Sequence, residues 1–348
     1  MFPIQEEILP TPFLTRLVNM SIWWFAFGYF ASYIPYSALT KAIASGRYPG
    51  LSQAVPGARM LPLSLLVTTC VMLLFLWLTG IIKHAHQANV GPLSIPYPSK
   101  GPLLSGLCTS AIIVTTTLAY TFSGLSIVFA MLLMRGGLLI LAPIVDAVSQ
   151  RETRWYSWVG LALSLAALVV AFAEKGTTSI TLIAALDIAV YLAAYFVRLR
   201  LMSRLAKSED PNKQLQFFAE EQFTAAPVSL LVIVLIGLLF PGPFPAEIAK
   251  GLAFSQLGPA FWGIVLIGLS SQMVGIFGGL ILLNKRENTF CVPVNRSSSI
   301  MAGVLASLVL TWWLGAPAPS AYQYTAAAII IVAILVLSLP SLLRKQEG

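Results

Sequence analysis

Charged residues are scarce in this chain. Asp, Glu, Lys and Arg together make up 10% of its 348 residues, against roughly 25% in ordinary soluble domains. This shortage excludes a soluble fold, because a chain of this length could not hide a hydrophobic content of 57% from water. We therefore expect an integral, multi-pass membrane protein whose surface is in contact with the lipid bilayer.

Cysteine and histidine are also rare. Cys70, Cys108 and Cys291 fall inside apolar runs, so we expect small buried side chains and not a disulfide framework. His84 and His86 have no cluster of Cys, Asp or Glu around them and are interpreted as loop residues. The sequence contains no catalytic triad motif, phosphate-binding glycine loop or metal-binding helix. It therefore predicts neither an enzyme nor a bound cofactor or metal.

Acidic residues are rarer than basic ones, and the formal net charge is +8. The basic residues lie at the ends of apolar runs and not on a polar domain, which argues against nucleic acid as a partner. Fourteen of them fall on the side that would hold both termini and five on the opposite side. This asymmetry predicts cytoplasmic termini. Acidic Glu6 and Glu7 stand where a secretory signal would be basic, so the first apolar run is expected to be a retained span. The short loops favour a bacterial inner membrane.

Ten apolar runs approach the roughly 20 residues that a membrane-spanning helix needs. They are Leu17–Thr40, Met60–Ile82, Pro102–Phe122, Leu125–Val148, Trp155–Ala173, Ile180–Met202, Gln216–Phe240, Pro259–Asn284, Thr289–Leu314 and Tyr322–Leu342. Proline- and glycine-rich turns separate several of these runs, as in residues 241–245 and 316–319. The predicted fold is an all-α membrane protein with ten transmembrane helices.

The two halves of the chain share residue spacings. An aromatic pair four residues apart recurs 162 positions later, and a Phe six residues before an Arg recurs 161 positions later. The matching sets are Tyr29 and Tyr33 with Tyr191 and Tyr195, and Phe129 and Arg135 with Phe290 and Arg296. Because five helices form each half, a duplication would be inverted across the membrane, as in many alternating-access transporters. We expect one membrane domain made of two repeats, residues 1–175 and 176–348.

Two arginines interrupt apolar helices and are the strongest candidates for a site. Arg135 and Arg296 each lie about 12–16 Å inside their helix, at 1.5 Å per residue. An arginine near the bilayer centre costs about 2.5–3.5 kcal/mol on insertion scales, so such residues face a cavity or a partner. Asp187 is the only carboxylate expected at a similar depth. One positive charge is then unmatched, and arginine binds phosphate or carboxylate well.

Other residues are secondary candidates for this site. Tyr29, Tyr33, Tyr191 and Tyr195 could line a cavity, since each pair lies on one helix face, although helix packing explains them equally well. Asn295 precedes the second arginine. Asp187 either holds one arginine in the empty state or takes part in proton coupling.

A pair of glutamates, Glu220 and Glu221, is predicted to lie one turn into the seventh span. A carboxylate near a helix start is favoured by the helix dipole. We interpret the pair as a solvated helix start and not as part of the substrate site.

Taken together, the ten short-looped spans, the cytoplasmic termini and the five-plus-five repeat resemble the drug/metabolite transporter superfamily. The turn at residues 149–153, followed by Gly160, is similar to a feature of its EamA-type repeat. In the triose-phosphate translocators, basic side chains on the fourth and ninth helices hold phosphate, and Arg135 and Arg296 look like occupants of those positions. Asn295 stands where those translocators have the lysine of a Lys-Arg pair. The step from Asn295 to Arg296 is similar to the Asn-Lys step of nucleotide-sugar transporters, whose seventh-helix asparagine is replaced here.

These features predict a secondary transporter or antiporter of a small anionic metabolite, phosphorylated or carboxylated. Arg135 and Arg296 would act as anion clamps at the membrane midplane. An exporter of neutral or zwitterionic compounds, in which the arginines are structural, is an alternative of the same class. A non-transporting scaffold or assembly protein is an alternative of another class. Small helix faces on the fifth and tenth spans could support a homodimer.

Overall fold

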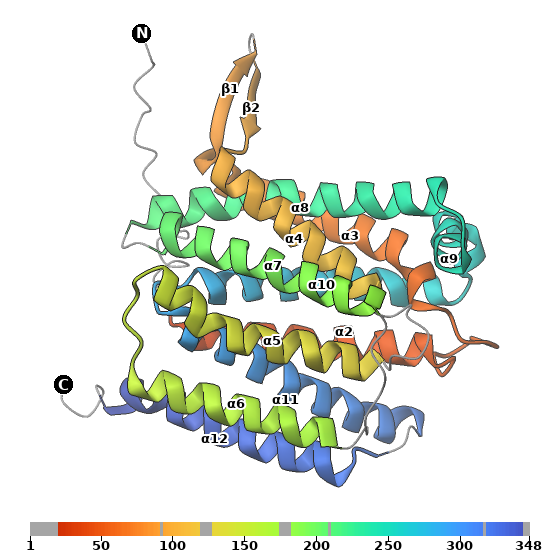
Figure 1. The fold of residues 1–348 in the computed structure, drawn as a ribbon. Helices are drawn as coiled ribbons and strands as arrows, with labels where there is room; N and C mark the ends of the chain where they lie inside the picture. Colours follow the sequence, from red (N-terminus) through yellow and green to blue (C-terminus); the bar gives the residue numbers. More distant parts are fainter. Residues whose placement is uncertain are drawn as a thin grey trace.

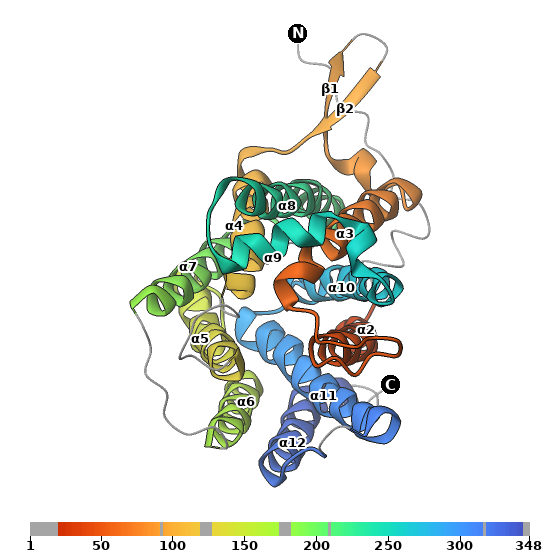
Figure 2. The same cartoon turned by 90° about the vertical axis from the view of Figure 1, so that its right-hand side faces the viewer.

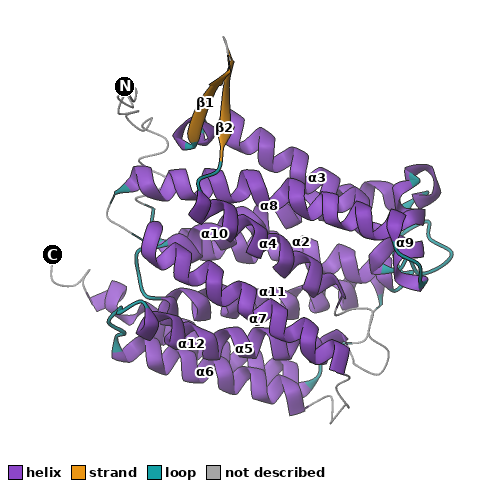
Figure 3. Cartoon of the chain, turned by 45° about the horizontal axis from the view of Figure 1, so that its top comes forward, coloured by secondary structure: helices purple, strands orange, loops and turns teal. Residues whose placement is uncertain are grey.

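The protein is a bundle of long α-helices with one small β-hairpin (Figures 1 and 3). A computed structural model describes residues 20–90, 93–118, 127–173, 182–207, 210–315 and 318–343. The helices of the first half are α2 (Ile22–Ala44), α3 (Gly57–Leu78), α4 (Lys100–Leu118), α5 (Ile127–Val148) and α6 (Trp155–Ala173). Those of the second half are α7 (Leu182–Leu205), α8 (Pro211–Leu239), α9 (Pro243–Leu252), α10 (Ala260–Leu283), α11 (Asn288–Leu314) and α12 (Ala321–Leu343).

Within the described ranges, five helices are long and apolar enough to cross a membrane, as expected for a multi-pass protein. They are α3, α8, α10, α11 and residues Ala321–Ser338 of α12. Large apolar side chains are exposed along the bundle, including Trp24, Trp77 and Leu238, at 62%, 70% and 63%. A soluble protein would bury many such side chains, so their exposure agrees with a surface that lipid covers.

Each of the ten apolar runs corresponds to one long helix, and most boundaries agree within a few residues. The largest differences are five residues: α2 begins at Ile22 and not at Leu17, and α8 begins at Pro211 and not at Gln216. Asp210 caps this helix, because its carboxylate accepts a hydrogen bond from the backbone of Asn212 at 2.9 Å, and proline suits the first helical position. The expected break near residues 123 and 124 lies outside the described residues.

Two structured segments lie where we expected only loops. The first contains a one-turn 3₁₀ helix, η1 (Ile81–His84), followed by strands β1 (His86–Val90) and β2 (Leu93–Tyr97), which pair antiparallel with His86 opposite Tyr97. The second is helix α9, which begins at Pro243 after Gly242, a residue with φ of 130°. Figure 1 shows the hairpin at one end of the bundle and α9 at the other.

Several helices of the first half have neighbours that match those of a helix in the second half. Helix α2 packs against α10 and α11, and its counterpart α7 packs against α4 and α5. Likewise, α4 packs on α8 as α10 packs on α3, while α6 packs on α12. In the end-on view, α6 and α12 lie together at one edge of the bundle, opposite the hairpin (Figure 2).

The three cysteines are free, as expected, but they differ in burial. Cys291 is buried, Cys108 is half-buried and Cys70 is exposed on α3. Burial of all three was therefore a wrong prediction. An exposed thiol on an apolar helix face is compatible with lipid contact, because cysteine behaves as a small hydrophobe.

Candidate functional site

The two interior arginines meet four tyrosines in one group, which we call the arginine–tyrosine cluster. It consists of Tyr29, Tyr33, Arg135, Tyr191, Tyr195 and Arg296. The Tyr29 hydroxyl lies within electrostatic reach of both arginines, of Tyr33 and of Tyr195. Its ring centroid is 5.6 Å from that of Tyr33, and the rings of Tyr191 and Tyr195 are 4.9 Å apart. The structure thus brings together six of the eight residues that the sequence singled out.

Each arginine donates a hydrogen bond to a tyrosine of its own half. Arg135 Nη2 lies 2.9 Å from the Tyr33 hydroxyl, and Arg296 Nη2 lies 3.0 Å from the Tyr195 hydroxyl. The Arg296 guanidinium also lies 5.6 Å from the centroid of the Tyr195 ring. The same donor and acceptor types therefore occur twice, on α5 with α2 and on α11 with α7.

The two arginines lie at similar depths. The end of α5 meets the start of α11, because Asp146 binds the backbone of Asn288. Arg135 lies 11 residues before Asp146, and Arg296 lies 8 residues after Asn288. At 1.5 Å per residue, they are about 16 Å and 12 Å from this common end. The residues that flank Arg296 from Phe290 to Ser299 are all buried, so it is held deep in the bundle.

Neither arginine has an acidic partner in the described part of the chain. Arg296 is 9% exposed, and its buried Nε has no hydrogen-bond partner. Tyrosine hydroxyls are neutral acceptors and do not balance a guanidinium charge. The cluster therefore contains two cations and no anion.

Asn295 and Asp187 differ in their relation to the cluster. A Cβ atom at Gly278 would lie 2.9 Å from the Tyr29 ring and 3.3 Å from Asn295 Nδ2, so these two side chains lie beside the same glycine. Asp187 is 8% exposed, its Oδ2 has no hydrogen-bond partner, and no ion pair joins it to either arginine among the described residues. This conformation therefore does not show Asp187 holding an arginine.

A buried ion pair joins α7 to α8 and was missed by the sequence reasoning. Arg198 donates to both carboxylate oxygens of Glu221, at 2.8 and 3.1 Å. Ser105 on α4 and Gln222 also donate to this carboxylate. Glu221 is 0% exposed, which makes the prediction of a solvated helix start wrong. Arg198 lies inside the expected run Ile180–Met202, close to its end, and α7 continues beyond this run to Leu205, so the charge lies within the helix.

Glu220 is also buried, and it fastens the hairpin to α8. Its carboxylate accepts hydrogen bonds from the backbone and ring Nδ1 of His86, at 3.1 and 2.7 Å, and from the backbone and hydroxyl of Ser99, at 2.7 and 2.6 Å. His86 is thus more than a loop residue. Because α8 begins at Pro211, Glu220 lies more than two turns inside the helix and not at its solvated start.

A third buried carboxylate joins the end of α5 to the start of α11. Asp146 accepts from the backbone and side chain of Asn288, at 2.9 and 2.7 Å, and from the backbone and hydroxyl of Thr289, at 2.6 and 2.7 Å. These bonds satisfy donors that a helix start leaves without intrahelical partners. The residue type alone did not reveal this role, since the two segments are 142 positions apart.

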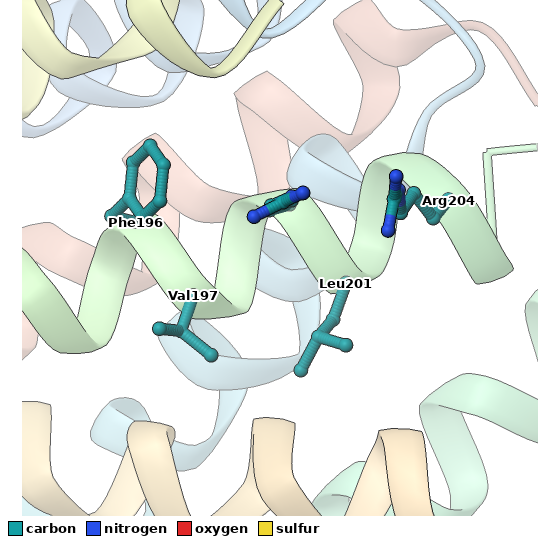
Figure 4. Close-up of a pocket in the computed structure, with 5 residues that line it drawn as sticks. Phe196, Val197, Leu201 and Arg204 are labelled. Carbon is teal, nitrogen blue, oxygen red and sulfur yellow. The ribbon is translucent and has the colours of Figure 1, made fainter. Parts of the chain in front are cut away.

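Two cavities described in the structure lie outside the arginine–tyrosine cluster. One, of about 240 Å³, is a shallow groove on α7 lined by Phe196, Val197, Arg200, Leu201 and Arg204; Figure 4 shows four of these residues labelled along the helix. The other, of about 590 Å³, is lined by residues 151–154 and 285–287, between the α5–α6 and α10–α11 loops. The buried charges, and not these surface cavities, single out the cluster as the candidate site.

Comparison with known proteins shows a shared fold. No family model matches the chain, and no curated protein matches it. A solved structure described as "Crystal structure of protein" is similar over 90% of this chain and 98% of its own, with a TM-score of 0.54 and 20% identity. At this identity the likeness concerns the fold alone.

Proposed function

We propose that this chain is a secondary transporter, with antiport as one mode, that carries a small anionic metabolite by alternating access. Arg135 and Arg296 bind the anion, a phosphorylated or carboxylated compound. Tyr29, Tyr33, Tyr191, Tyr195 and Asn295 line the site. Asp187, which has a buried oxygen without a partner, is the candidate for proton coupling.

The proposal includes ten transmembrane helices in two inverted repeats. Besides the five apolar helices, α2, α4, α5, α6 and α7 have 23, 19, 22, 19 and 24 residues. At 1.5 Å per residue, 19 residues give about 28 Å, close to the hydrocarbon thickness of a bilayer. The corresponding neighbours of the two halves and the repeated arginine–tyrosine hydrogen bonds support the repeat. Figure 1 shows the start of α2 and the end of α12 at the same end of the bundle, in agreement with termini that both face the cytoplasm of an inner membrane.

The observation that carries the proposal is the excess of positive charge deep in the bundle. Two guanidinium groups lie in one cluster with neutral tyrosines, and among the described residues no carboxylate pairs with them. A buried cation without a counter-ion is costly. An anionic solute that binds there supplies the missing charge and accepts bidentate hydrogen bonds.

Thermal melting of the detergent-purified protein tests this proposal. A ligand that binds only the folded state stabilises it by about 2.7 kcal/mol at one hundred times its Kd. We expect phosphorylated or carboxylated metabolites to raise the melting temperature of the wild type. The Arg135→Ala and Arg296→Ala variants should lose this response. The Lys213→Ala variant, which removes an exposed charge from α8, should keep it.

Uptake into proteoliposomes then tests transport itself. Vesicles loaded with a stabilising anion should exchange it for labelled external anion, and Arg296→Ala should abolish the exchange. Stabilisation by neutral amphiphiles alone would favour the exporter of neutral compounds, for which the hydrogen bonds to Tyr33 and Tyr195 already give the arginines a structural role. A broad panel without any stabilising compound would favour a scaffold or assembly protein.

A further inference from the structure

The cavity of about 590 Å³ between two loops has the composition of an anion site. We call it the loop cavity. Its lining consists of Arg151, Glu152, Thr153, Arg154, Lys285, Arg286 and Glu287. Four of these seven residues are basic and two are acidic. One of the acidic residues, Glu287, is already bound, because its Oε1 accepts a hydrogen bond from Ser157 at 2.6 Å. The positive charge of the lining therefore exceeds its negative charge.

The loop cavity is held in shape by its own hydrogen bonds. Lys207 Nζ donates to the carbonyl of Arg286 at 2.8 Å, and Arg151 donates to the carbonyls of Ser203 and Lys285. The backbone N–H of Arg286 donates to the Asn284 side chain at 3.2 Å. These contacts tie the α10–α11 loop to the α5–α6 loop and to the segment that follows α7, so they fix the backbone that carries Lys285 and Arg286.

Arg286 has donor capacity that the protein does not use. Its guanidinium lies over the Phe290 ring, with Cζ 4.3 Å from the ring centroid. Its Nη1 is buried and has no hydrogen-bond partner. A buried, charged donor without an acceptor is unfavourable unless a ligand supplies one. Guanidinium groups suit phosphate oxygens, because two N–H groups can bind two oxygens at once.

Exposed tryptophans place the loop cavity at the level of the lipid headgroups. Trp155 and Trp158, on the first turn of α6 beside the cavity, are 67% and 48% exposed. Trp158 Nε1 donates to Thr153, a residue of the lining, at 3.0 Å. Tryptophan is enriched at the interface between membrane and water, and basic pockets at the ends of membrane helices bind anionic headgroups.

We propose that the loop cavity binds the phosphate of an anionic phospholipid, with Arg286, Arg154 and Lys285 as its ligands. The site differs from the arginine–tyrosine cluster, and the proposal does not depend on transport. Its phosphate chemistry is shared with soluble phosphorylated solutes, so the test must separate the two sources.

Native mass spectrometry of the full-length protein in neutral detergent provides this test. We expect dioleoylphosphatidylglycerol to bind and dioleoylphosphatidylcholine to bind far more weakly. The Arg154→Gln/Arg286→Gln variant should weaken the phosphatidylglycerol complex roughly thirtyfold, from the loss of two basic contacts. The Arg154→Gln/Lys285→Gln variant replaces only exposed side chains and serves if the first does not fold.

Matched controls and opposing outcomes make the test decisive. The Lys100→Gln/Lys213→Gln variant removes two exposed charges elsewhere and should bind the lipid as the wild type does, as should Arg296→Ala. Unchanged phosphatidylglycerol binding in both loop-cavity variants would overturn the proposal, as would equal binding of phosphatidylcholine by the wild type. Displacement of the lipid by glycerol 3-phosphate at equal phosphate concentration would overturn the lipid assignment in favour of a soluble anion.

Discussion

Removing one partner of the Arg198–Glu221 pair should destabilise the protein strongly. The two side chains are 8% and 0% exposed, and two hydrogen bonds of 2.8 and 3.1 Å join them. Breaking a buried pair costs about 3–5 kcal/mol, because it leaves one charge buried without its partner. The loss of stability in Arg198→Met should be near the lower limit of this range, since Ser105 and Gln222 still donate to the remaining carboxylate. The loss in Glu221→Leu should be near the upper limit, because the Arg198 guanidinium is then buried without its carboxylate.

The double variant Arg198→Met/Glu221→Leu should lose less stability than either single variant, because no uncompensated charge remains. Unfolding by a denaturing detergent, followed by tryptophan fluorescence, measures all three, with Lys213→Met as an exposed control on the same helix. The reasoning is refuted if both single variants lie within about 1 kcal/mol of the wild type, the range of exposed pairs. It is equally refuted if the loss of stability in the double variant equals the sum of the losses in the two single variants.

Three further predictions concern other contacts. Asp146→Ala removes four hydrogen bonds at the start of α11. The variant should lose at least the ~1–3 kcal/mol of folding stability that an unpaired buried donor costs, seen as a lower denaturation midpoint. An unchanged midpoint would contradict this. Partial burial alone would raise the pKa of Glu247, but hydrogen bonds from Lys250 and Arg59 outweigh it and lower the pKa. The stabilisation from the Glu247 carboxylate is therefore complete above the ordinary glutamate pKa and is lost as pH falls through the lowered value. The melting temperatures of Glu247→Gln and the wild type should converge in acid. A Cβ atom at Gly251 would overlap the Arg59 carbonyl oxygen, whereas one at Gly303 would meet nothing within 4 Å. Gly251→Ala should therefore lose about 1–3 kcal/mol of folding stability. Gly303→Ala should not be destabilised.

The helices were predictable from sequence because each needs only a continuous apolar run. The runs located every long helix, since lipid contact imposes apolar residues over most of a span. The hairpin and α9 were not predicted. Their residues alternate too little, or extend too briefly, to differ from a loop rich in proline and glycine.

The residues of the candidate site were predictable because they interrupt the apolar runs that located the helices. Arg135 and Arg296 stand out because charge is rare inside apolar helices, and the repeated spacing pointed to tyrosines that lie in the same cluster. The roles of Arg198, Glu221 and Asp146 were not predictable in this way. They lie close to the ends of apolar runs, where charge is ordinary, and their partners are set by how helices from different parts of the chain pack.

The hairpin projects from one face of the molecule and so distinguishes that face from the other. Its two strands stand clear of the helices (Figure 1), while Glu220 anchors it at both ends through His86 and Ser99. An antibody fragment raised against this projection would bind a segment whose base is fixed to α8. In intact or inverted vesicles it would show which compartment this face of the protein contacts. It would also add mass to a small particle for electron microscopy without touching the arginines in its interior.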